Sequence, residues 1–190
     1  MHYRRLGRSG LKVSEISFGA WVTFGSQIDD KTAAQLLHTA YEGGINFFDN
    51  ADVDAKGAAE KVMGKAIKDL PREALVLSSK VFWPTMPGPN GRGLSRKHIT
   101  ESIHQSLKNL QVDYLDLYFC HRYDPDTPVE EVVVTMNTLI QQGKILYWGT
   151  SEWRASQIAE AHGIARQLGL IPPAMEPPQY HMHHRRRVEH

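Results

Sequence analysis

Short apolar segments with strand character alternate with helical patterns along nearly the whole chain. The apolar segments lie at residues 16–19, 45–48, 74–80, 114–120 and 145–148, and each is short enough to be a buried strand. Helical patterns separate them, at residues 33–40, 58–70, 95–107, 128–143 and 155–168. Strands that alternate with helices in this order form a parallel sheet with helical crossovers. The pattern therefore predicts an α/β fold.

The ends of this alternating pattern carry signals of their own. Residues 3–13 have the pattern of two short strands around Gly7-Arg8-Ser9-Gly10, which predicts a hairpin ahead of the sheet. Near the other end, residues 174–176 lead toward a sixth strand near Gln179. Before the fourth helix, we expect Thr127 to be the N-cap and Pro128 the first helical residue.

Composition narrows the class of protein. A chain of 190 residues can bury a substantial core, so we expect one domain over residues 1–190. The formal net charge of +1 gives no electrostatic reason to expect nucleic acid or a membrane as a partner. Cys120 is the only cysteine, the N-terminus has no apolar signal segment, and no apolar run is long enough to cross a bilayer. These features favour a cytoplasmic protein.

Four of the expected strands end in a polar side chain: Asp49, Lys80, His121 and Ser151. In a (β/α) barrel the carboxyl ends of the strands meet on one face, where active sites are built. Asp49 and Lys80 would form an ion pair, and a nearby histidine can relay a proton near neutral pH. Each residue alone has a structural alternative, such as a turn cap or a solvated strand end. Four in succession favour a functional site.

Several segments together resemble the aldo-keto reductases. They include GINFFDNADVDAKG, LVLSSKVFW, GLSRKHI and GKILYWGTSEW, and the similarity covers essentially the whole chain. Within the family the chain looks most like the branch that contains the voltage-gated potassium channel β subunits and their bacterial relatives. The resemblance implies a (β/α)8 TIM barrel with an N-terminal β-hairpin. It also implies NADPH (NADP) as cofactor and reversible reduction of aldehydes and ketones to alcohols.

The resemblance also implies roles for single residues. Three positions of the family's catalytic tetrad fall on Asp49, Lys80 and His121, and the fourth falls on Asp54. In the channel β subunits the histidine position carries asparagine, so His121 favours an enzyme. The cofactor-binding positions fall on Trp21, Gln27, Asp49, Ser151, Glu152 and Gln179.

Asp54 departs from the family pattern, which has a proton-donating tyrosine at this position. Hydride transfer to a carbonyl leaves negative charge on the oxygen, so a donor must supply a proton. Aspartate has an ordinary pKa of about 3.9, and an ammonium such as that of Lys80 would lower it further. We therefore expect an ionised Asp54 and strongly impaired reduction, with His121 as a less well placed donor.

Length is the second departure. Barrels of this kind run to about 250 residues or more, so we expect a barrel truncated after about the sixth strand. Such a sheet has two unpaired edges. The chain is then a fragment, or it completes itself by association, for example as a homo-oligomer. The histidines of the tail, at 181, 183, 184 and 190, suggest a metal site, but no carboxylate or cysteine spacing supports one, and we expect none.

These features predict an NADPH-dependent oxidoreductase that acts on a small carbonyl substrate and is weakened by Asp54 and by truncation. The alternatives are a non-catalytic nicotinamide-binding regulatory subunit, similar to the channel β subunits, and an inactive fragment. Asp54 favours the regulatory subunit, His121 favours the enzyme, and the missing strands favour the fragment.

Overall fold

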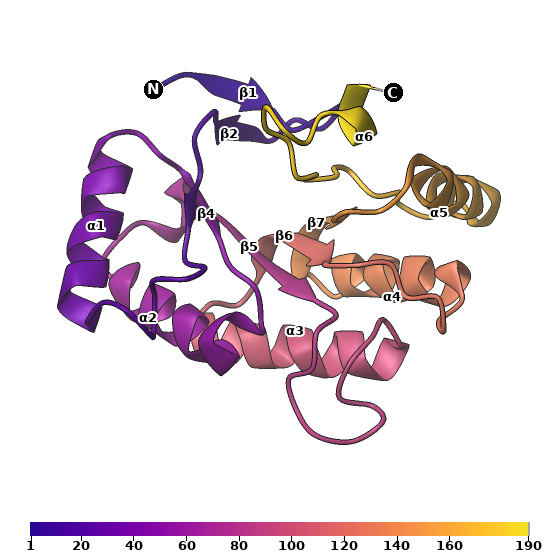
Figure 1. Ribbon diagram of the computed structural model, residues 1–190, viewed down its shortest axis with the longest axis horizontal. Helices are drawn as coiled ribbons and strands as arrows, with labels where there is room; N and C mark the ends of the chain where they lie inside the picture. The colour runs from indigo at the N-terminus through magenta and orange to yellow at the C-terminus, as the bar shows by residue number, and fades with distance from the viewer. Residues whose placement is uncertain (190) are drawn as a thin grey trace.

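A parallel sheet, a hairpin and a series of helices make up the fold, which was obtained as a computed structural model describing residues 1–189 (Figure 1). The hairpin consists of β1 (Tyr3–Arg5) and β2 (Lys12–Ser14). The sheet has the order β3-β4-β5-β6-β7 and comprises β3 (Phe18–Gly19), β4 (Phe47–Asp49), β5 (Val76–Val81), β6 (Leu115–Cys120) and β7 (Ile145–Thr150). The helices are α1 (Asp30–Glu42), α2 (Ala58–Ala66), α3 (Arg96–Leu110), α4 (Val129–Gln141), α5 (Ala155–Leu168) and α6 (Arg186–Glu189). Two short 3₁₀ turns, η1 (Asp54–Gly57) and η2 (Arg72–Ala74), precede α2 and β5.

The predicted alternation of strands and helices is confirmed. Neighbouring strands of the sheet are also neighbours in sequence, and all four pairs are parallel. Helices α1 to α5 line one side of the sheet, while the hairpin and α6 lie on the other side (Figure 1). The hairpin expected over residues 3–13 is present at β1 and β2.

The core is divided into two layers by the sheet. The larger layer lies between the sheet and the helices, and includes the fully buried Phe48, Met63, Ile103 and Trp148. The smaller layer lies under the hairpin, where Leu6 packs with strand side chains of the opposite face, such as Val76, Leu117 and Phe119. Strands buried on both faces have near-continuous apolar sequences, which is why short apolar runs located them in the sequence.

Local capping signals fix several helix ends. The side chain of Asp29 accepts a hydrogen bond from the Thr32 N–H at 2.7 Å, and Ser95 accepts one from the His98 N–H at 3.2 Å. Caps of this kind typically stabilise a helix by about 1 kcal/mol.

Two predicted helix ends were wrong. Pro128 is the N-cap of α4 and not its first helical residue, because its ψ of 133° is extended. Helix α2 ends at Ala66, not at Leu70, because a turn closed by the Leu70 N–H and the Ile67 carbonyl follows it. Each difference reflects a backbone conformation that the residue type alone does not determine.

The sheet is open, with β3 and β7 at its edges. The prediction of a sixth strand near Gln179 was wrong, because no further parallel strand forms within residues 1–189. Residues 174–175 make only a short contact with β7: the Ala174 N–H donates to the Trp148 carbonyl at 2.8 Å, and the Thr150 N–H donates to the Met175 carbonyl at 3.1 Å. The expected barrel is therefore present as a five-stranded parallel sheet that does not close. None of the helices within the described residues combines the length and hydropathy needed to cross a membrane.

Candidate functional site

The carboxyl ends of four neighbouring strands bring the predicted polar residues to one edge of the sheet. Asp49 ends β4 and pairs in register with Ser78, two residues before Lys80 on β5. Cys120, the last residue of β6, pairs with Val81 on one side and Thr150 on the other. His121 and Ser151 directly follow these last two strands, so all four side chains start from the same end of the sheet.

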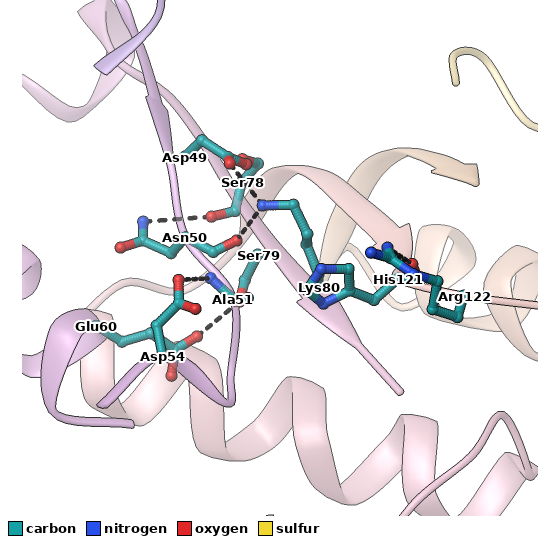
Figure 2. Close-up of polar contacts among 10 residues, drawn as sticks. All are labelled: Asp49, Asn50, Ala51, Asp54, Glu60, Ser78, Ser79, Lys80, His121 and Arg122. Carbon is teal, nitrogen blue, oxygen red and sulfur yellow. Dashed lines mark hydrogen bonds and ion pairs between the residues drawn. The ribbon is translucent and has the colours of Figure 1, made fainter. Parts of the chain in front are cut away.

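Lys80 forms an ion pair with Asp49 (Figure 2). Its ammonium donates to Oδ2 of Asp49 at 2.5 Å and to the backbone carbonyl of Asn50 at 2.7 Å. The hydroxyl of Ser78 donates to the other carboxylate oxygen. The side chains of Lys80 and Asp49 are 13% and 32% exposed, so the charges are partly shielded from water and their hydrogen bonds are strengthened. The ammonium is thereby held at the strand ends.

Asp54 is hydrogen-bonded to the backbone near this pair and not to the Lys80 ammonium. Its carboxylate accepts a hydrogen bond from the backbone N–H of Ala51 at 3.0 Å, whereas the Lys80 ammonium points to Asp49 and Asn50 (Figure 2). Burial raises the pKa of Asp54 to about 6, while the charge of Lys80 acts in the opposite direction. Lys80 lowers this pKa as expected, but the expectation of a pKa below the ordinary value was wrong, because the loss of hydration outweighs the attraction. With that pKa, about nine tenths of the Asp54 side chains are ionised at pH 7.

His121 is a neutral histidine. Burial, followed by the charges of Lys80 and Arg122, lowers its pKa to about 3. The expected proton relay near neutral pH is therefore not supported. Its ring lies edge-on to Trp83, with the ring centres 6.2 Å apart. Its Nδ1 atom is buried and has no hydrogen-bond partner among residues 1–189, so the imidazole retains an uncommitted polar atom near the ion pair.

Ser151, Glu152 and Gln179 are brought together at the end of β7. The Ser151 N–H donates to the Cys120 carbonyl at 3.0 Å, which continues the ladder between β6 and β7. The next residue, Glu152, has a φ of 59°, an uncommon left-handed conformation for a residue with a side chain. Its carboxylate accepts a hydrogen bond from the backbone N–H of Gln179 and pairs with Arg187. Glu152 thus links the segment that contains Gln179 to the strand end.

Trp21 and Gln27 lie in the segment between β3 and α1, which leaves the sheet at the same end, because Gly19 of β3 pairs with Asp49. Trp21 is 75% exposed and Gln27 is also exposed. Within the described residues, neither side chain has a hydrogen bond to the Asp49–Lys80 pair. These two predicted site residues therefore share the edge of the sheet with the ion pair but are not bonded to it.

A buried polar network, which was not predicted from the sequence, connects β5 to helices α2 and α3 near the same strand ends. Glu60 of α2 is fully buried and accepts hydrogen bonds from the Ser79 hydroxyl at 2.7 Å and from the Asn109 amide at 2.8 Å. It thereby connects α2, β5 and α3. The Asn50 amide also donates to the Ser78 carbonyl. The signal in the sequence was the polar pair Ser78-Ser79 inside an otherwise apolar strand.

The histidines of the tail form a turn. His181 and His184 make an isolated antiparallel bridge, and the ring centres of His181 and His183 are 6.3 Å apart. Over residues 1–189 no group of three or more histidine, cysteine or acidic side chains is arranged to hold a metal ion.

Known proteins match the chain over almost its full length. Residues 15–190 match the family described as "Aldo/keto reductase family". A "Probable voltage-gated potassium channel subunit beta" from Arabidopsis thaliana is 54% identical, and one from Oryza sativa subsp. japonica is 53% identical. In both cases the similarity covers 100% of this chain and 58% of the relative. The chain therefore spans little more than half the length of these relatives, and it belongs to the aldo/keto reductase family.

Proposed function

We propose that residues 1–190 form one domain of an NADPH-dependent oxidoreductase that reduces aldehydes and ketones, with proton donation weakened by Asp54. The observation that carries the proposal is the Asp49–Lys80 ion pair at the strand ends, next to the neutral His121. A partly buried ammonium and an imidazole N–H both stabilise negative charge on an oxygen atom. Such a pair suits a reaction in which a carbonyl oxygen becomes an alkoxide.

The strand ends suit the nicotinamide part of the cofactor. Ser151 and Gln179 carry a hydroxyl and an amide that match a carboxamide group, and Glu152 holds their segments together. His121 Nδ1 and Asn50 Oδ1 are buried polar atoms without partners in the described residues, which suits a polar ligand at this edge. NADPH, when bound, would supply the hydride. Trp21 and Gln27 are exposed at the same edge of the sheet, so their side chains are free to contact a cofactor or substrate there.

Proton transfer is the step at which this site is weak. Asp54 is mostly ionised at pH 7 and its carboxylate is engaged with the Ala51 N–H. An anion does not donate a proton, and it repels the charge that develops on the carbonyl oxygen. His121 is neutral, so it would orient the carbonyl oxygen by a hydrogen bond more readily than it would protonate it. The expected activity is therefore low.

A fluorescence titration with NADPH tests the cofactor site, with NADH for comparison. We expect saturable binding to the folded chain, weakened about tenfold when Ser151→Ala removes a hydrogen bond. Gln141→Ala, an exposed change at the end of α4, is the matched control and should leave the affinity within about twofold. A folded chain that binds neither nucleotide would contradict the proposal.

A second function is favoured by the relatives named as potassium channel β subunits and by Asp54 itself. The chain would then bind the nicotinamide cofactor in the cytoplasm and act as a regulatory subunit that associates with a channel or with further copies of itself. NADPH binding without turnover, even after Asp54→Tyr, would support this second function over the enzyme.

A further inference from the structure

Arg122 directly follows His121 at the end of β6, and its guanidinium lies beside that histidine (Figure 2). Its Nη1 donates a hydrogen bond to the His121 carbonyl at 2.5 Å, and its Cζ lies 5.7 Å from the centre of the Trp83 ring. The same ring packs against the His121 imidazole. After burial and the charge of Lys80, the charge of Arg122 contributes to the low pKa of His121. The guanidinium therefore acts on the candidate active site.

Arg122 is a half-buried cation without a carboxylate partner. Within residues 1–189 no ion pair joins it to an acidic side chain. The nearest carboxylate in the sequence, Asp124, is already held, because it accepts hydrogen bonds from the Leu94 N–H at 2.7 Å and the Thr127 hydroxyl at 2.8 Å. Nε and Nη2 of Arg122 are not among the fully buried polar atoms of the described residues, so a ligand can reach them from solvent.

The other charges at these strand ends are mostly engaged elsewhere. Three carboxylates have partners of their own, namely Asp49 with Lys80, Glu152 with Arg187, and Glu176 with Thr150. Asp54 is mostly ionised at pH 7 and is bonded to a backbone N–H only. Its charge opposes a bound anion, whereas the charge of Arg122 attracts one. Arg122 is thus the cation at this edge that a ligand can engage without breaking an existing ion pair.

We propose that Arg122 recognises an anionic group on the substrate, so that the site prefers small carbonyl compounds that carry a carboxylate or a phosphate. The inference rests on the proposed reduction of aldehydes and ketones at this site. The planar guanidinium presents parallel N–H donors that match two oxygens of either group. Contact with Trp83 holds the guanidinium in place. Anchoring of the anionic group at Arg122 orients the substrate with its carbonyl toward Lys80 and His121.

Ligand-observed NMR titration of the 190-residue chain tests the recognition, with 4-(hydroxymethyl)benzoate and its neutral amide, 4-(hydroxymethyl)benzamide, as probes. Both are alcohols of the product type, so neither reacts with lysine side chains as an aldehyde does. We expect the carboxylate to bind about tenfold or more tightly than the amide. Glycerol 3-phosphate against glycerol extends the comparison to phosphate, and a preference for only one of the two anions identifies which group the site takes.

Arg122→Met removes the charge and keeps a side chain of similar length. It should weaken binding of the carboxylate about tenfold or more and leave binding of the amide within about twofold. Arg122→Lys should restore part of the affinity, because the charge returns without the planar pair of donors. Arg5→Met, an exposed change on β1, is the matched control and should alter neither affinity. An arginine with a merely structural role would affect both probes equally.

Kinetics in the Asp54→Tyr variant separate this inference from the proposed function. In that background Arg122→Met should raise KM for 4-carboxybenzaldehyde about tenfold, with kcat and the KM for methyl 4-formylbenzoate within about twofold. Reduction of both aldehydes with equal KM would support the proposed function and overturn this inference. Anion binding that depends on Arg122, without reduction of any aldehyde, would support the recognition and contradict the proposed reaction. The inference is also overturned if both anions bind no better than their neutral counterparts, or if Arg122→Met leaves anion affinity unchanged.

Discussion

Asp52 and Asp54 are two buried carboxyl groups only two residues apart, and burial dominates the behaviour of both. It raises their pKa values to about 8 and about 6. In the unfolded chain both would titrate near the ordinary value of 3.8. The folded state therefore binds these protons more tightly than the unfolded state, and the stabilisation that the protons provide is complete only below about pH 4.

The free energy of unfolding should accordingly fall as pH rises from about 4 to about 8. Asp52→Asn removes the larger of the two contributions. The variant should therefore lose less stability than the original chain between pH 5 and pH 8, by up to several kcal/mol. Urea denaturation at the two pH values measures the effect. Asp69→Asn is the control, and an unchanged slope in Asp52→Asn would show that Asp52 titrates normally.

Side-chain chemistry was predictable from the sequence where it follows from position on a strand. Asp49 and Lys80 were expected at neighbouring strand ends, and the structure joins them. The pKa values of Asp54 and His121 were not predictable in the same way, because burial outweighs the nearest charge at Asp54 and adds to it at His121. The depth of burial depends on tertiary packing, which residue spacing does not give.

Two helical glycines differ in whether a neighbouring helix leaves room for a side chain. Gly64 lies in α2 where a Cβ atom would stand 2.6 Å from the Leu110 carbonyl oxygen of α3 and 2.7 Å from that of Asn109. Gly163 lies in α5, where a Cβ atom would meet no atom within 4 Å. The close approach of α2 and α3 therefore requires Gly64.

Gly64→Ala should destabilise the chain by about 1–3 kcal/mol, because backbone atoms would have to shift to admit the methyl group. Gly163→Ala, the matched control, should stabilise it by up to about 1 kcal/mol through helix propensity alone. Thermal unfolding of both variants followed by circular dichroism checks the prediction. Equal effects in the two variants would mean that α2 and α3 do not pack as described.

Helices and strands were predictable to the extent that their ends are determined locally. The side chains of Asp29 and Ser95 cap α1 and α3, and the left-handed Gly169 follows α5, so these helix ends are set by adjacent residues. The prediction of a sixth strand was wrong, since residues 174–175 make only two backbone hydrogen bonds to β7. A strand needs a neighbour to complete its pairing, and local sequence does not supply one.

The open sheet is the main property of the molecule as a whole. It presents the Asp49–Lys80 ion pair at its strand ends, in a chain of the aldo/keto reductase family that spans 58% of the length of the relatives it matches. For the molecule as a whole we therefore propose two separate claims: the site retains its charge-stabilising residues, and Asp54 leaves it without a proton donor.

The rate of NADPH oxidation with 4-nitrobenzaldehyde, measured for the original chain and for Asp54→Tyr, tests the second claim most directly. Asp54→Asn is the matched control, since it removes the charge without adding a suitable acid. We expect a very low rate in the original chain, a small gain in Asp54→Asn because only the repulsion is removed, and an increase of about 10²-fold or more in Asp54→Tyr. A folded, NADPH-binding Asp54→Tyr variant with no gain in rate would contradict the claim that position 54 limits the reaction.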